Sequence, residues 1–408
     1  MTTQQKTEYT AKPQRAGQVS RESAFWIVAY TLFVALLGSV LPTPLYVIYQ
    51  QRWHFSDGIL TAIFAVYVVG VLAALLFVGH LSDQIGRRRV LLPALVLAVV
   101  SALVFVFAQN VLWLFVARLL IGLAVGVFTG TATAALSELE PRGNTRFAAL
   151  SSSAATSGGL AVGPLFASLL VQYAPWPTVL VYLVYLVLLL PAFVGTWLIP
   201  ETVQASHPGV DLRPQRLGVP ADIRPAFVLS AITIFCTFSV SGLFTSLVPS
   251  LVSNQLHLTN VVLGGAVVFA LLGASALTQL LLRDVSHRSA MGIGLVLIAS
   301  GLILVVFAVA WQFLLLLFLG AICAGVGYGL AFMGSLGQVN HVAPPAHRGE
   351  VTSSYFFIAY LGTALPSLGV GFAVGLIGLY AATILFVVVI DLIALGIVAT
   401  MVWRMLRD

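Results

Sequence analysis

The feature that most constrains this chain is a series of long apolar segments that recurs along almost its whole length. A helix needs about 20 apolar residues to cross the hydrocarbon core of a bilayer. Only 8% of the residues are charged, whereas soluble domains carry about 25%. We therefore predict an all-α membrane protein with twelve transmembrane helices, which span residues 25–49, 58–79, 89–108, 111–136, 146–171, 178–199, 225–249, 260–282, 290–309, 312–337, 350–374 and 378–402.

The distribution of Lys and Arg predicts the orientation of these spans. An even number of spans places both termini on one side, and cytoplasmic loops carry an excess of Lys and Arg. If the termini are cytoplasmic, all of the nineteen Lys and Arg except Arg52 and Arg118 fall on the cytoplasmic side. The net charge of +6 is then an orientation signal, so we expect no nucleic-acid partner. The expected location is the cytoplasmic (inner) membrane.

The chain divides into two halves of six spans. Its longest internal polar stretch lies near the midpoint, and two pairs of residues, Asp83 with Asp284 and Arg87 with Arg288, recur at the same offset. A duplicated six-helix unit is typical of secondary transporters, whose substrate site lies between the repeats near the middle of the membrane. The predicted divisions are a cytoplasmic tail 1–24, a bundle 25–199, a cytoplasmic loop 200–224, a bundle 225–402 and a tail 403–408.

The loop between the second and third spans reads GHLSDQIGRRR and is polar between two apolar runs. Gly79 permits close helix approach, and Asp83 suits a helix start, where the macrodipole favours negative charge. Gly86 permits a sharp reversal. The alternative interpretation is a solvated turn with ordinary topogenic arginines, and for Arg88 and Arg89 the two interpretations are balanced.

This loop resembles the loop 2–3 signature of the major facilitator superfamily, G-x-L-x-D-x-x-G-R-R-[RK]. The resemblance extends over the chain, because span number, central loop, orientation and repeat all agree with it. It implies a conformational latch on the cytoplasmic side that closes against the start of span 11 in the outward-open state. The implied latch residues are Gly79, Asp83, Gly86, Arg87 and Arg88.

Span 4 places Arg118 inside the membrane, where a charged side chain is costly and indicates function. The run around it resembles the pattern L-x-x-x-R-x-x-Q-G of proton-coupled members of the superfamily, with Ile121 in place of the glutamine. The resemblance implies a role for Arg118 in proton coupling. The alternative is an arginine that extends toward the outer interface.

Span 5 contains GGLAVGPLFAS, which resembles the exporter-associated pattern G-x-x-x-G-P-x-x-G-G, although Ala167 and Ser168 replace its last two glycines. Small residues at four-residue spacing allow close helix packing. Spans 4 and 5 both show this spacing, and the predicted packing residues are Gly122, Gly126, Gly159, Gly163 and Pro164.

The residue that carries the proton is not identified by the sequence. Many proton-driven exporters of the superfamily carry an acid in span 1, and this chain has none there. Glu138 near the end of span 4, Asp391 in span 12 and Asp83 remain alternatives. A neutral Asp391 that is hydrogen-bonded to a helix or a lipid headgroup is also consistent with its position.

The predicted substrate cavity is aromatic, which suits an apolar or amphipathic ligand. Each aromatic taken singly is more often a helix-packing residue than a substrate contact. Hydroxyl groups of Ser239, Ser241 and Thr363 lie in the same spans. The aromatic candidates are Phe33, Tyr67, Phe235, Phe238, Phe269, Tyr328, Tyr355, Phe356 and Tyr360.

Together these features favour a monomeric secondary transporter that exports a small amphipathic molecule in exchange for protons, in contact with membrane lipids. Because Arg118 has no acid near it in the sequence, import of an organic anion or nutrient with protons is the alternative. A membrane enzyme or receptor is a further alternative, but the sequence shows no catalytic, metal-binding or phosphate-binding motif. We expect no catalytic residue, metal or cofactor, with the proton gradient as the energy source.

Overall fold

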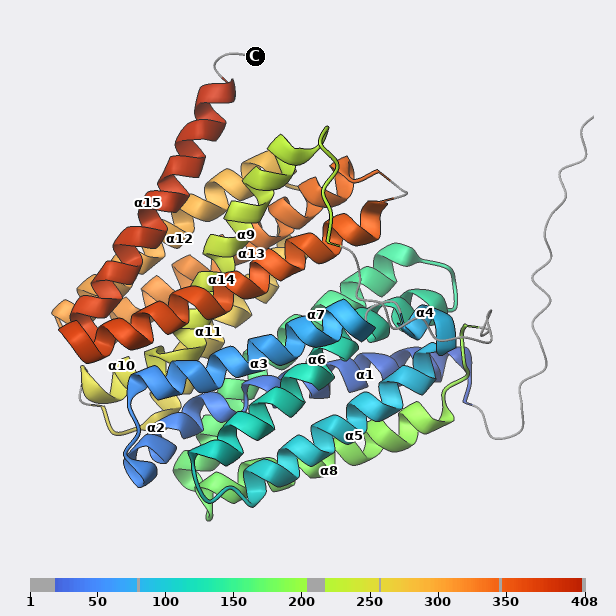
Figure 1. Ribbon diagram of the computed structural model, residues 1–408, viewed down its shortest axis with the longest axis horizontal. Coiled ribbons are helices and arrows are strands. Elements are labelled where there is room, and N and C mark those ends of the chain that lie inside the picture. The colour runs from blue at the N-terminus through green and yellow to red at the C-terminus, as the bar shows by residue number, and fades with distance from the viewer. Residues whose placement is uncertain (1–18, 79–80, 204–216, 257, 345–346, 406–408) are drawn as a thin grey trace, which may run out of the picture.

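The computed structural model describes residues 19–78, 81–203, 217–256, 258–344 and 347–405. These residues form fifteen α-helices and no strand (Figure 1). The predicted Gly79 and most of the central loop lie outside the described residues. The helices are α1 (Arg21–Val40), α2 (Pro42–Trp53), α3 (Asp57–Val78), α4 (Leu81–Ile85), α5 (Arg87–Val106), α6 (Val111–Leu139), α7 (Thr145–Tyr173), α8 (Pro177–Leu198), α9 (Arg224–Ser246), α10 (Val248–Asn254), α11 (Val261–Leu281), α12 (His287–Ala310), α13 (Leu314–Val342), α14 (Arg348–Ile377) and α15 (Leu379–Met405).

Twelve of the described helical runs are long and apolar enough to cross a membrane, which confirms the predicted number. Several of the helices extend beyond the predicted apolar cores, because polar residues form their terminal turns. Span 4, for example, is predicted over 111–136 and continues to Leu139, and span 11 runs over Arg348–Ile377 instead of 350–374.

The first and seventh spans are broken at corresponding places. The first consists of α1 and α2, which meet at Leu41, and the seventh consists of α9 and α10, which meet at Leu247. Pro42 and Pro249 lie in the first turn of the second piece of each. Spans 25–49 and 225–249 were predicted as continuous, and the breaks differ from that prediction. Their physical reason is proline, which lacks a backbone N–H and disrupts a continuous helix.

Side-chain caps fix where several of the helices begin. The Asn110, Asn144 and Asn260 side chains accept hydrogen bonds from the first-turn N–H groups of α6, α7 and α11. Ser20 and Ser286 do the same for α1 and α12. These caps satisfy amide donors that have no partner within the helix. By fixing these helix starts, the caps limit the length of the connections between spans.

The helices form two bundles, α1–α8 and α9–α15, which lie in the lower and upper parts of Figure 1. The bundles meet along two equivalent seams, where α3 packs against α14 and α7 packs against α11. The helices paired in these seams are the second and eleventh spans and the fifth and eighth spans. In a repeat of six spans, the second span corresponds to the eighth and the fifth to the eleventh. The two seams are therefore equivalent under the repeat.

Two ends of the molecule need names. The arginine-rich end is where α3 ends and α5 begins with Arg87, Arg88 and Arg89, and the α2–α10 end is the opposite one. Between these ends, large apolar side chains are exposed on the outer helices, such as Leu190 on α8 and Leu392 on α15. An exposed apolar surface of this kind fits lipid contact.

Candidate functional site

Arg118 of α6 is completely buried beside the break in the first span. Its Nε donates a hydrogen bond to the Tyr46 hydroxyl on α2, and its Nη1 donates to the Ser39 carbonyl on α1 at 2.5 Å. Arg118 lies seven residues after the start of α6, roughly 10 Å along the helix. The side chain therefore ties α6 to both pieces of the broken helix.

Aromatic rings surround the rest of the guanidinium group. Its Cζ lies 5.2 Å from the centroid of Tyr46, 5.4 Å from Tyr67 and 5.8 Å from Phe64, so α2 and α3 both contribute cation–π contacts. Such contacts offset part of the desolvation cost of a buried cation. Together with the two hydrogen bonds, they explain how the interior holds a charge at this position.

One part of this charge has no partner. The Nη2 atom of Arg118 is buried and makes no hydrogen bond within the described residues. In the same part of the chain, no carboxylate pairs with Arg118. An unsatisfied buried donor is costly, so this N–H group is suited to donate a hydrogen bond to an anionic or carbonyl oxygen of a ligand.

The latch residues form a second charged cluster at the arginine-rich end. Arg87 pairs with Asp83 and with Glu138, whose carboxylate lies 2.8 Å from Nη2 of Arg87. Nη1 of Arg87 donates to the Ser82 hydroxyl at 2.6 Å. Its backbone N–H donates to the Glu201 carboxylate at 2.6 Å. Glu138, one of the proposed proton carriers, thus belongs to the latch cluster and not to the Arg118 site.

Gly86 occupies a backbone conformation that favours glycine. Its φ is +112° at the turn between α4 and α5, and a Cβ there would overlap the Glu201 carboxylate. Arg88 lies over the Trp197 ring of α8, with Cζ 5.7 Å from the ring centroid. The latch residues that the structure describes therefore make their contacts within the first bundle, and the expected closure against the start of α14 stays a prediction.

Asp391, the third proposed proton carrier, lies on α15 far from both clusters. It is largely buried, and its Oδ1 makes no hydrogen bond within the described residues. Apolar side chains of α12 and α15, including Val306 and Val387, line the hollow beside it. The position is peripheral to the seams between the bundles.

Glycines bring the helices of the first bundle into backbone contact. A Cβ at Gly122 or Gly126 of α6 would meet backbone atoms of α3, and Gly126 would approach the Val71 carbonyl to 2.6 Å. Gly159 and Gly163 of α7 lie equally close to α1, with the Leu37 carbonyl 2.9 Å from a Cβ at Gly163. Pro164 lies inside α7, and its carbonyl lies 2.6 Å from a Cβ placed at Gly265 of α11, across the seam.

Three of the aromatic candidates of the second bundle form one cluster. The Phe238 ring of α9 lies 5.9 Å from Tyr328 of α13 and 5.8 Å from Tyr360 of α14, measured between centroids. Phe332, which the sequence did not single out, lies 6.1 Å from Phe238. Tyr360 of α14 also lies near Tyr67 of α3, on the other side of the α3–α14 seam. We call Phe238, Tyr328, Phe332 and Tyr360 the aromatic wall.

The remaining cavity candidates do not join this wall. Tyr355 is buried and hydrogen-bonded to Ser335 at 2.7 Å, with Phe356 against its ring. Phe33 lies against Gly158 of α7, and the backbone of Phe235 packs against Gly362. Phe269 is 37% exposed on α11. Tyr67 contacts Arg118 and thereby connects the wall to the buried charge.

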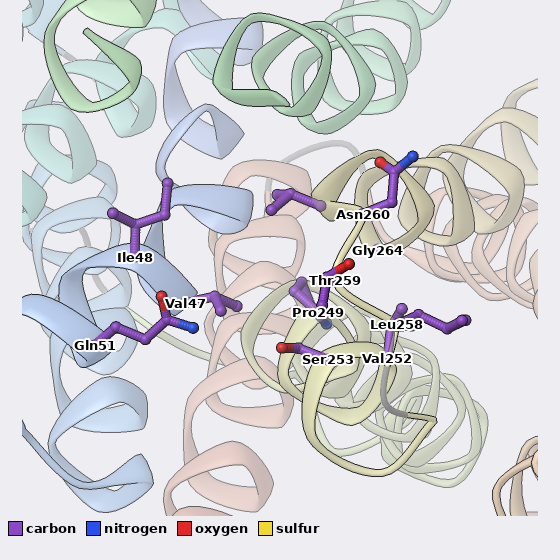
Figure 2. Close-up of a pocket in the computed structure, with 11 residues that line it drawn as sticks. Val47, Ile48, Gln51, Pro249, Val252, Ser253, Leu258, Thr259, Asn260 and Gly264 are labelled. Atoms are coloured by element: carbon purple, nitrogen blue, oxygen red, sulfur yellow. The ribbon is translucent and has the colours of Figure 1, made fainter. Parts of the chain in front are cut away.

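A hollow of about 290 Å³ lies at the α2–α10 end, between the two bundles (Figure 2). Gln51 of α2 faces Ser253 of α10 across it, and Thr259 and Asn260 add polar groups at the start of α11. The hollow therefore lies where the two broken helices approach each other.

Comparison with known families identifies the chain. The model of the Major Facilitator Superfamily matches residues 28–367. The chain belongs to this superfamily. It is an integral, multi-pass membrane protein of a family of transporters, and the resemblance noted in the loop at 79–89 is confirmed at the level of the whole chain.

Relatives within the superfamily include both efflux proteins and transporters of aromatic acids. The "Multidrug resistance protein MdtL" of Klebsiella pneumoniae is 28% identical over 74% of this chain and 76% of its own length. The "Gallate transporter" of Pseudomonas putida is 30% identical over 44% of this chain, and the "4-hydroxybenzoate transporter PcaK" of the same species is 28% identical over 42%. The chain covers only 39% and 37% of the lengths of these two relatives.

Several residues of this superfamily member escaped the sequence analysis. Tyr46 and Ser39, which hold Arg118, are uncharged residues of an apolar span and are far from Arg118 along the chain. Glu201 was assigned to the linker, although it is the first acidic residue after span 6 and lies at the same end as Arg87. The position of Glu201 in the sequence was the signal that could have assigned it to the cluster around Arg87.

Proposed function

We propose that this superfamily member is a monomeric secondary active transporter of the cytoplasmic membrane that exports small amphipathic molecules in exchange for protons. The arginine-rich end faces the cytoplasm in this proposal, as do both termini. The two bundles rock about the seams, so that a site between them opens to one side at a time. The substrate leaves chemically unchanged, and the proton gradient supplies the energy.

The observation that carries the proposal is the buried Arg118. Placing an arginine at the centre of a membrane helix costs about 2.5–3.5 kcal/mol on insertion scales. Here the charge is held by the first span at its break and by α3, which forms one seam with the second bundle. A charge that contacts both the break in the first span and a helix of the seam can couple proton or ligand binding to movement of the bundles.

The aromatic wall supports an amphipathic substrate. Its rings come from α9, α13 and α14, and Tyr67 adds a ring from the first bundle. Aromatic surfaces with a few hydroxyl groups can bind flat apolar molecules of several different shapes. Tyr328 and Tyr360 supply hydroxyl groups.

Two observations favour export. The relative with the name of a multidrug resistance protein matches most of both chains. The second is the sequence around Pro164, where the exporter-like pattern falls at the α7–α11 seam and brings the Pro164 carbonyl against Gly265.

Import of an aromatic acid with protons is the second candidate, and Arg118 itself favours it. The free Nη2 of Arg118 is suited to a carboxylate, and the Tyr46 and Tyr67 rings beside it suit an aromatic ring. Two relatives are named as transporters of gallate and of 4-hydroxybenzoate. Charge-assisted hydrogen bonds between Arg and carboxylate are strong and directional.

Flux in reconstituted vesicles separates the two candidates. The purified protein is placed in proteoliposomes, and a pH gradient of either sign is imposed. An amphipathic fluorescent dye and radiolabelled 4-hydroxybenzoate serve as probes, and protein-free vesicles with the same gradients serve as the control.

Dye movement against its own gradient, driven by protons moving in the opposite direction, is the expected result. Accumulation of 4-hydroxybenzoate together with protons supports the second candidate. Proton-independent equilibration of both probes, equal to that in protein-free vesicles, contradicts both candidates.

A further inference from the structure

A second hollow lies away from the seams, between α12 and α15 at the arginine-rich end. Its volume is about 380 Å³, and its walls are almost entirely apolar. Gly292 and Val296 of α12 face Met401 and Val402 of α15 across it. Arg288, in the first turn of α12, is the one charged residue that lines it within the described chain.

The hollow opens outward, toward the surface that a bilayer covers. Ile293 is 50% exposed and Val402 is 49% exposed. From Arg288 to Val296 the helix rises by roughly 12 Å, which is close to half of the ~30 Å hydrocarbon core. The hollow therefore has the depth of one lipid leaflet and a cation at its membrane-surface end.

Arg288 is the repeat counterpart of Arg87, but it has lost the partners that Arg87 has. Within the described residues no carboxylate pairs with Arg288, and Asp284 faces Arg146 and Arg283 instead. The end of α6 supplies Glu138 to Arg87, whereas the equivalent end of α13 carries Asn340 and His341. The positive charge of Arg288 is thus free for an external anion.

We propose that this hollow binds one anionic glycerophospholipid. An acyl chain lies along Gly292 and Val296, and the phosphate group lies at Arg288 near the hydroxyl groups of Ser286 and Ser289. Basic pockets between transmembrane helices at a membrane surface are suited to anionic headgroups. A soluble anion would leave the apolar walls exposed, and a zwitterionic lipid would leave the arginine without a net counter-charge.

The structure supplies matched variants for a test. Arg288→Gln removes the charge, and Arg283→Gln removes another exposed charge at the same end that does not line the hollow. Gly292→Leu fills the hollow, because a Cβ there meets nothing within 4 Å. Gly396→Leu is its control, since Gly396 has equal space and lies outside the hollow.

Binding is measured by native mass spectrometry of the delipidated full-length protein in detergent. Phosphatidylglycerol and phosphatidylcholine with identical acyl chains are titrated separately, and inorganic phosphate competes in a third series. Gel filtration and the thermal unfolding midpoint establish that each variant is folded.

We expect the wild-type protein to prefer phosphatidylglycerol by about fivefold, the selectivity that one arginine confers near a membrane surface. Arg288→Gln removes this preference, and Gly292→Leu weakens binding of both lipids. The two control variants and inorganic phosphate leave binding unchanged. Equal loss in Arg283→Gln, undiminished preference in Arg288→Gln or undiminished binding in Gly292→Leu overturns the proposal.

Discussion

Arg118 shows how one residue can combine a structural and a functional requirement. Its hydrogen bonds go to a phenol and a carbonyl, and its remaining contacts are aromatic faces. None of these partners carries a formal negative charge. Within the described residues the guanidinium group therefore has no internal counter-ion, which leaves it electrostatically available to a substrate or to a change in protonation elsewhere.

Replacing Arg118 with alanine should abolish coupled transport and leave the protein folded. The substitution removes the buried charge and also the desolvation cost of that charge, so the two effects on stability oppose each other. We expect proton-driven flux in proteoliposomes to fall to the level of protein-free vesicles. Unchanged proton-dependent flux would count against a coupling role.

Two conservative variants sharpen this prediction. Arg118→Lys keeps the charge but loses the planar fork that reaches Tyr46 and Ser39 together, so transport should fall only in part. Tyr46→Phe removes one hydrogen-bond acceptor and retains the ring contact. If both variants behave like Arg118→Ala, packing and not charge explains the effect.

The latch cluster makes a separate prediction at the scale of single residues. Asp83→Asn weakens the pairing with Arg87, which should favour the state that is open at the arginine-rich end. Because the Asp83 side chain is 61% exposed and that of Glu138 is 33% exposed, solvent screens the Asp83 pair more strongly. Glu138→Gln should therefore produce the larger shift, of about 1 kcal/mol or more.

Spin-label distances measure this shift. Labels at Arg142 and Arg348 report on the separation of the two bundles at the arginine-rich end, in a protein whose two cysteines have been replaced. A longer distance population in Glu138→Gln than in Asp83→Asn is the expected order. Identical distance distributions in wild type and both variants contradict the latch role.

At the scale of helices, glycine makes the seams between the bundles narrow. A Cβ on Gly371 of α14 would overlap the Thr61 side chain of α3 near the α2–α10 end, and Gly265 makes the equivalent contact on the other seam. At these two glycines the facing helices leave no room for a side chain. Any movement of the bundles must open or close them as units, because packed interfaces do not deform continuously.

Gly371→Ala should destabilise contact between the bundles at the α2–α10 end. Overpacking of a tight contact costs about 1–3 kcal/mol, which corresponds to about a five- to 150-fold change in the ratio of two states. Distances between spin labels on α2 and α10 should lengthen. Gly369→Ala is the matched control, because a Cβ at Gly369 meets nothing within 4 Å, and an equal change in that variant would contradict a steric role.

At the scale of the whole molecule, positively charged residues and exposed apolar residues occupy different positions along the axis that joins the arginine-rich end to the α2–α10 end. Of the described arginines, all but Arg52 of α2 and the buried Arg118 lie at one end, and exposed apolar side chains cover the outer faces of the bundles between the ends. Such a distribution has one stable arrangement across a bilayer with a positive-inside bias. It also places Arg288 and its hollow at the membrane surface, where an anionic lipid can reach them.

Cysteine accessibility in intact cells tests the orientation. Gln109 and Arg142 are exposed residues in short connectors at opposite ends of α6. A membrane-impermeant maleimide should label Gln109→Cys in intact cells and Arg142→Cys only after permeabilisation. The reverse pattern would place the arginine-rich end outside the cell, and both the latch and the direction of transport would then need reassignment.

The sequence by itself determined the twelve spans and the presence of a charge at Arg118. Each of these follows from local hydropathy or from the chemistry of one residue. The residues that surround Arg118 were decided by the tertiary structure, since Tyr46 and Ser39 are more than seventy residues away in the chain. The same holds for Glu138 and Glu201 at Arg87, and for which aromatic residues form the aromatic wall. Hydropathy fixes which segments enter the membrane, but only packing of one helix against another decides which side chains share a site.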